Sequence, residues 1–133
     1  MEKKINAKSK PLIFFKQYLT ILQPIYNLTS RETDVLSYLL YLNYKYKNVP
    51  EEARNKIILD YDSKVDISNQ FDLNMPVIYN IISSLRKKKY AGEYFLKGKK
   101  INKKVPLLPY DVDKKYSLIF NFEIENEELE INK

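Results

Sequence analysis

The chain lacks cysteine, histidine and tryptophan, and only two of its 133 residues are glycine. Without cysteine it forms no disulfide, thiolate nucleophile or cysteine-ligated metal site. Without histidine it lacks the commonest zinc ligand and the base that activates most nucleophilic serines. Carboxylates are present, but no pair of them is spaced as an acid–base couple. The sequence therefore predicts a protein that is not an enzyme, with no catalytic residues, metal site or cofactor.

Long hydrophobic runs are absent as well. A membrane-spanning helix needs about 18–20 consecutive apolar residues, and the stretch Pro11–Leu22 is interrupted by Lys16 and Gln17. The basic start, Met1–Lys10, is not followed by the apolar core and cleavage site of a signal peptide. We therefore expect no membrane contact and an intracellular protein at synthesis. Abundant Lys, Asn, Ile and Tyr are typical of AT-rich genomes, which favours a phage gene expressed in a host cytoplasm.

The charge of the chain is unevenly distributed. The net charge is +6, but the stretch Arg86–Lys104 alone holds nine Lys or Arg residues against one acid, Glu93. The segment Glu123–Lys133 is opposite in sign, with five Glu against one Lys. Such a distribution suits contact with a polyanion, with a partner's oppositely charged patch, or between neighbouring copies.

Hydrophobic periodicity predicts a first helix over Leu12–Ile25, because apolar residues recur on one face at helical spacing. Pro24 is expected to end that helix. A second helix, extending to about Tyr46, begins after Thr29. The Thr29 hydroxyl can cap the free amides while Glu32 reaches back, which is the capping-box pattern.

Three more helices are expected before residue 90. The first extends from Pro50 to about residue 59, since proline is tolerated in a first turn and the acids after it suit the positive helix end. Asp62 is expected to cap the next helix, which extends through Phe71. Asn74 is expected to cap the last one, which ends at about Lys88.

The helix that follows Thr29 has a wider apolar surface than a single core contact requires. Besides aliphatic residues at core spacing, it carries Tyr38, Tyr41 and Tyr44. One interpretation is that this helix is enclosed within its own domain. The other is a self-association or partner surface, because tyrosine suits interfaces that are apolar on one side and wet on the other.

Strands are expected after the last helix. Two of them, Tyr94–Leu96 and Ile101–Val105, are joined as a hairpin by the turn Lys97–Lys100. Strict alternation predicts a further strand near the end of the chain. Its apolar positions are Tyr116, Leu118, Phe120, Phe122 and Ile124. This strand either completes a three-stranded sheet with the hairpin or pairs with another subunit.

The stretch Val65–Lys104 combines a helix, a tight turn, a second helix and a basic hairpin. The apolar residues that bury the facing sides of the two helices are Ile67, Phe71, Leu73, Ile78, Ile82 and Leu85. Together with the helix start Leu-Thr-Ser-Arg-Glu at Leu28–Glu32, this order resembles the winged helix-turn-helix domains of MarR-type regulators and of phage or plasmid replication initiators. The resemblance covers about Leu28–Leu108. It implies DNA binding, with the second helix of the motif in the major groove and the hairpin, or wing, touching the backbone or the minor groove.

The expected fold class is α+β. It is a winged helix-turn-helix domain, mainly α-helical with a small antiparallel wing sheet, over residues 28–110. A basic N-terminal arm and helix precede it at residues 1–27. A C-terminal strand and an acidic tail follow it at residues 111–133.

The second helix of the motif departs from a base-reading pattern, which places Arg, Lys, Asn, Gln, Ser or Thr near the helix start. The matching positions here hold Met75, Pro76, Val77, Tyr79 and Asn80. Only Asn80 has the amide that pairs well with adenine. An exposed patch of Met75, Val77 and Tyr79 is expected to suit a protein partner better than a base.

The phosphate-binding candidates are the cations at the end of that helix and in the hairpin, since each neutralised phosphate releases counterions. They are Arg86, Lys87, Lys88, Lys97, Lys99, Lys100, Lys103 and Lys104. The alternative is that these side chains form a solvated surface without a ligand.

Two functions of different class follow. The first is a non-enzymatic structural assembly protein, a phage virion component such as a neck or tail connector or ring, whose partners are protein subunits that include its own copies. The second is a sequence-specific DNA-binding regulator or replication initiator of a phage or plasmid. The apolar start of the second motif helix, the tyrosine-rich helix and the opposed charges favour the first.

Overall fold

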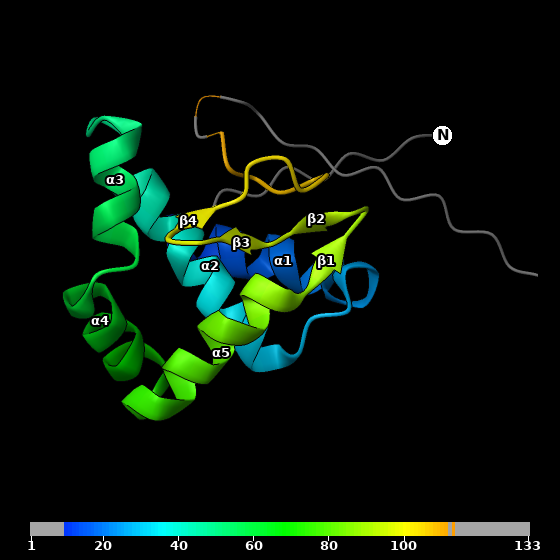
Figure 1. Cartoon of the computed structure of the whole chain (residues 1–133), viewed down its shortest axis with the longest axis horizontal. Coiled ribbons are helices and arrows are strands. Elements are labelled where there is room, and N and C mark those ends of the chain that lie inside the picture. Colours follow the sequence, from blue (N-terminus) through cyan, green and yellow to red (C-terminus); the bar gives the residue numbers. More distant parts are fainter. Residues whose placement is uncertain (1–9, 112, 114–133) are drawn as a thin grey trace, which may run out of the picture.

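Figure 1 shows the structure, a computed structural model that describes residues 10–111 and 113. The helices of this part are α1 (Pro11–Tyr26), α2 (Ser30–Lys45), α3 (Glu51–Ile58), α4 (Tyr61–Phe71) and α5 (Met75–Lys87). Its strands are β1 (Lys89–Tyr90), β2 (Glu93–Tyr94), β3 (Leu96–Lys97) and β4 (Lys100–Ile101). They form two antiparallel pairs, β1–β2 and β3–β4. The described part of the chain is therefore α+β, as predicted.

Side-chain caps set the starts of three helices. The predicted capping box of α2 is confirmed, because the Thr29 hydroxyl accepts the Glu32 N–H and the Glu32 carboxylate accepts the Thr29 N–H. Asn74 caps α5, also as predicted. The prediction that Asp62 caps α4 is wrong. Asp60 is the cap, accepting the N–H of Ser63 at 2.7 Å, and Asp62 lies inside the first turn, where its charge favours the positive helix end.

The prediction that Pro24 ends α1 is also wrong, since the helix continues to Tyr26. A proline this close to a helix end removes only one hydrogen bond of the last turn. Tertiary contact holds that turn in place, because Tyr26 is 2% exposed and its hydroxyl donates to the Pro106 carbonyl at 2.7 Å. The helix ends instead at Asn27, which takes the left-handed conformation with φ 56°.

The helix α2 lies at the centre of the fold and contacts α1, α3, α4 and α5. Its aliphatic residues at core spacing are fully buried. Tyr38 is buried too, at 9% exposed, and its ring meets the ring of Phe71 with 6.1 Å between centroids. Tyr41 and Tyr44 are half-buried against the same core. The chain's own helices therefore cover much of the broad apolar surface of α2.

Two hairpins follow α5, where the sequence predicted one. The β1–β2 turn at Ala91 and Gly92 has positive φ at both residues, 51° and 81°, which suits a tight two-residue turn. The β3–β4 hairpin pairs Leu96 with Ile101, both buried. The predicted continuation of the second strand to Val105 is wrong, because β4 ends at Ile101.

Asn102 gives the physical reason for that early end. Its buried side chain donates to the Glu93 carboxylate at 2.9 Å and to the Tyr94 carbonyl at 2.8 Å. Its amide oxygen accepts the N–H of Lys104 at 3.1 Å, an Asx turn that bends the chain away from the ladder. Asn102 is buried directly after the buried Ile101, so the alternation of the strand breaks at the residue whose side chain bends the chain.

After the hairpins the chain returns to α1 and α2. The Leu107 carbonyl accepts from the Tyr18 hydroxyl at 2.6 Å, and the Tyr110 carbonyl accepts from the Asn43 amide at 2.9 Å. The predicted C-terminal strand, the acidic tail and all but the last residue of the N-terminal arm lie outside the described residues. Between residues 10 and 113, apart from the undescribed position 112, no helix combines the length and apolarity needed to cross a membrane.

Candidate functional site

The helix α5 turns one side toward the core and the other outward. Ile78, Ile82 and Leu85 are at most 1% exposed, and Ile81 is 8% exposed. These positions recur every three or four residues, so they form one stripe of the helix. The opposite stripe is left for contact with something outside the core.

That opposite stripe carries hydrogen-bonding and charged side chains, and we call it the outer face of α5. Asn80, Ser83 and Lys87 follow one another at a spacing of three and four residues; Asn80 and Lys87 are exposed and Ser83 is half-buried. Tyr79, at 48% exposed, and the exposed Arg86 lie seven residues apart along one border of this row. The outer face therefore brings together four predicted site residues: Tyr79 and Asn80 near the start of α5, and Arg86 and Lys87 in its last turn.

Met75 and Val77 do not belong to the outer face. Both are half-buried and pack against the core, so the predicted exposed patch of Met75, Val77 and Tyr79 is wrong for its first two members. The phase of the helix explains this, because Met75 precedes the core residue Ile78 by three positions and Val77 precedes Ile81 by four. Of the tyrosines of α2, Tyr38 is buried in the core, and Tyr41 and Tyr44 are half-buried against it.

One border of the outer face is cationic. The Lys64 ammonium of α4 lies 4.7 Å from the centroid of the Tyr79 ring, a cation–π contact. Arg86 donates through Nε to the carbonyl of Gly98 at 2.7 Å, which ties α5 to the β3–β4 turn. Lys99 follows directly in that turn. We call Lys64, Arg86 and Lys99 the basic edge.

The Lys64 ammonium feels the charges of the other two cations of the basic edge. Partial burial lowers the pKa of the Lys64 ammonium, and the charges of Arg86 and Lys99 lower this pKa further. Asp60 acts in the opposite sense, but its carboxylate already caps α4. The charges of Arg86 on α5 and Lys99 in the β3–β4 turn therefore disfavour the charged form of Lys64 on α4.

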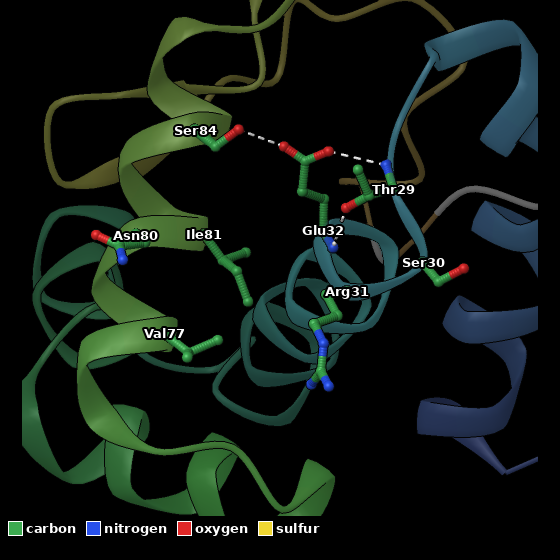
Figure 2. A pocket seen from close by; sticks show the side chains of 8 residues that line it. All are labelled: Thr29, Ser30, Arg31, Glu32, Val77, Asn80, Ile81 and Ser84. Atoms are coloured by element: carbon green, nitrogen blue, oxygen red, sulfur yellow. Dashed lines mark hydrogen bonds between the residues drawn. The ribbon is translucent and has the colours of Figure 1, made fainter.

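The other border of α5 faces the start of α2 across an open groove of about 470 Å³ (Figure 2). The groove is lined by Thr29, Ser30, Arg31, Glu32, Val77, Asn80, Ile81 and Ser84. Val77 and Ile81 point from α5 toward α2, whereas Asn80 lies on the outward side of α5. Arg31 is exposed and lies across the groove from Val77, so this border also carries a cation.

A buried carboxylate holds the end of the groove together. Glu32 is 3% exposed and accepts hydrogen bonds from the Thr29 N–H at 2.8 Å, from the Ser84 hydroxyl and from the Lys88 ammonium at 2.5 Å. Lys88 also donates to the Asn27 carbonyl at 2.9 Å. Burial by itself raises the pKa of Glu32, but these donors together lower it below its usual value. Lys88, predicted to bind phosphate, is thus engaged inside the fold.

The other phosphate candidates divide into two groups. Lys97 pairs with Glu93 and Lys103 with Glu51, each at 3.5 Å between charged atoms, and both lysines are exposed. Across the part of the chain that the structure describes, no ion pair involves the remaining candidates, which are exposed. These are Arg86, Lys87, Lys99, Lys100 and Lys104.

Three side chains of this surface were not predicted: Ser83, Lys64 and Arg31. The spacing of Ser83 from Asn80 and Lys87 was a signal for its place on the outer face. Lys64 and Arg31 join the surface only through the packing of α4 and α2 on α5, which the sequence does not state. Among residues 10–111 and 113, no three or more acidic side chains are grouped to hold a metal ion.

No protein-family model matches the chain, and neither a curated protein nor a solved structure matches it significantly. The resemblance to MarR-type and replication-initiator domains therefore stays a prediction.

Proposed function

We propose that the chain is a winged helix-turn-helix protein that binds double-stranded DNA. In this proposal α5 enters the major groove and the β3–β4 hairpin is the wing. The observation that carries it is the outer face of α5, where the exposed Asn80 and Lys87 lie between Arg31 on one border and the basic edge on the other. An α-helix fits the major groove, and amide and ammonium groups are among the side chains that read base edges there.

The charges support the same assignment. Backbone phosphates border the major groove on both sides, and proteins hold them with Arg, Lys and hydroxyl groups while base contacts supply specificity. Arg31 stands at one border of α5, and the basic edge stands at the other. Met75 and Val77 are half-buried against the core, so most of the exposed side chains of α5 are polar, which suits a base-reading helix. A regulator or a replication initiator of a phage or plasmid fits this chemistry.

The test is selection from a random duplex pool, followed by affinity measurements on the selected and a scrambled duplex. A sequence-specific protein prefers the selected duplex by about 10³-fold or more. Asn80→Ala should lose about 1–3 kcal/mol of that discrimination at one base pair and leave binding to the scrambled duplex nearly unchanged. Asn48→Ala, an exposed asparagine beyond the end of α2, is the matched control. Unchanged discrimination in the Asn80 variant contradicts major-groove reading by α5.

A second candidate is favoured by a different observation. Ile13, Ile21 and Ile25 of α1 are 48%, 47% and 49% exposed, and their spacing of eight and four residues puts them along one side of the helix. Such an apolar stripe suits self-association in a structural assembly protein, for example a connector or ring of a phage virion. The occupant in this proposal is a second copy of the chain.

The mass of the purified protein in solution separates this candidate from the first. A self-assembling subunit should be larger than its 15.9 kDa monomer at micromolar concentration, and Ile21→Ser with Ile25→Ser should return it to the monomer. Gln17→Ser, on the same side of α1, is the control. A wild-type protein that stays monomeric contradicts the assembly candidate and leaves the DNA candidate standing.

A further inference from the structure

The basic edge places cations from three elements along one border of α5, where the charges of Arg86 and Lys99 act on the Lys64 ammonium. Lys64 comes from α4, Arg86 from α5 and Lys99 from the β3–β4 turn. Like charges held together cost free energy unless an anion neutralises them. The acid that acts on Lys64 is Asp60, and its carboxylate is already the cap of α4.

We infer that Lys64, Arg86 and Lys99 form a shared seat for one phosphodiester group of the DNA backbone. This inference rests on the proposed function and deepens it, because it assigns these three residues to a single phosphate.

The geometry of Arg86 supports a shared seat. Its Nε–H is bound to the Gly98 carbonyl, which fixes the plane of the guanidinium beside the turn. Within residues 10–111 and 113, no hydrogen bond or ion pair occupies its two terminal nitrogens. Two parallel N–H groups match two oxygens of a phosphate, which is why Arg suits bidentate phosphate binding.

The Lys64 side chain is held in place by its neighbours. Its ammonium lies on the Tyr79 ring, and the side chain is half-buried. Tyr79 itself belongs to the outer face of α5, so the ring holds Lys64 against the border of the surface that meets the duplex. Lys99 closes the seat from the hairpin side, one residue beyond the Gly98 carbonyl that fixes Arg86.

Salt dependence of duplex binding tests the sharing directly. The slope of log K against log salt falls by about 0.9 for each phosphate that the protein no longer neutralises. If Lys64 and Lys99 hold separate phosphates, Lys64→Ala with Lys99→Ala should reduce the slope by about 1.8. If they share one with Arg86, the double variant should bind every duplex sequence about fivefold to tenfold more weakly while the slope changes by less than about 0.9. Lys56→Ala, an exposed lysine on α3, is the control and should change neither quantity.

The outcomes separate this inference from the proposed function. A slope reduced by about 1.8, or a double variant that binds like the Lys56 control, overturns the shared seat while DNA binding by the wild type still supports the function. A wild type that binds no duplex overturns the function and the seat together. Titration of the protein with inorganic phosphate distinguishes the source of the anion, because saturable binding at millimolar phosphate reassigns the seat to free phosphate and overturns its assignment to the DNA backbone. We expect no saturation.

Discussion

Glu32 is the residue on which the position of α5 depends most. Its carboxylate completes the capping box of α2 by accepting the Thr29 N–H. The same carboxylate accepts a hydrogen bond from Ser84 in the last turns of α5 and pairs with Lys88, which directly precedes β1. A buried charge is tolerated only when its acceptor sites are filled in this way. The same residue therefore links the helix start predicted from sequence to a tertiary contact 56 residues away.

Glu32→Gln should lower the free energy of unfolding at pH 7 by about 2 kcal/mol, because the amide keeps the shape but loses the charge that Lys88, Ser84 and the Thr29 N–H stabilise. The folded-state pKa of Glu32 lies below the ordinary value of 4.5, so its contribution is full above that value and is lost as pH falls through the folded pKa. Urea unfolding at pH 7 and near pH 3 should show the gap between wild type and variant closing in acid.

A matched control for that experiment is Glu51→Gln. Glu51 pairs with Lys103 at 3.5 Å, but its side chain is 48% exposed, so water screens the pair. This variant should lose less than about 0.5 kcal/mol at pH 7. Equal losses in the two variants, or a Glu32 gap that persists in acid, contradict the role given to the buried carboxylate.

At the scale of elements, the paired hairpins owe their shape to Asn102. Its amide joins β2 to the segment after β4 through Glu93 and the Tyr94 carbonyl, and it is 4% exposed. Asn102→Ala should cost about 2 kcal/mol of unfolding free energy, because the Tyr94 carbonyl and the Glu93 carboxylate lose a donor. Asn102→Asp keeps the Asx turn but removes the amide protons and places a second carboxylate beside Glu93, so it should cost more than Asn102→Ala.

Chemical denaturation measures that cost, and amide hydrogen exchange locates it. The expected pattern is faster exchange at Phe95 and Asn102, whose N–H groups bond across the hairpins, with little change in α1 and α2. Exchange that accelerates uniformly over the whole chain contradicts a local role for Asn102.

The elements also show which parts of the fold the sequence could predict. The starts of α2 and α5 were predictable because their caps, Thr29 and Asn74, act within three residues. The end of α1 was not, because Tyr26 is held by Pro106, 80 residues further along the chain. The end of β4 was not either, because it depends on the contacts that the Asn102 side chain makes across the two hairpins. Local signals fix where many helices begin, and tertiary contacts decide where some elements stop.

The same division holds for the candidate site. Asn80 and the cations of the last turn of α5 follow from sequence position and residue type alone. The burial of Met75 and Val77, the engagement of Lys88 by Glu32 and the arrival of Lys64 at Tyr79 depend on how helices pack. The kinds of side chain at the site were therefore predictable, but the exact set of residues that form it was not.

At the scale of the whole molecule, α1 shares one core with the helices that follow it. Leu19 and Leu22 of α1 are at most 1% exposed, and α1 packs along α2. The last described segment crosses back over α1, where its carbonyls accept from Tyr18 and Tyr26. The apolar surface that α2 presents to α1 would be open to water without α1, so we expect both helices to unfold together.

Leu22→Ala should therefore destabilise the whole described fold by about 2–5 kcal/mol, since it removes buried methyl groups and leaves a cavity. The loss should appear in a single cooperative transition, with the circular dichroism of the helices and the fluorescence of the tyrosines changing at the same denaturant concentration. Ile21→Ala is the control on the same helix, because Ile21 is 47% exposed and should lose less than about 1 kcal/mol. Two separated transitions, or a Leu22 loss no larger than the Ile21 loss, contradict a single core that includes α1.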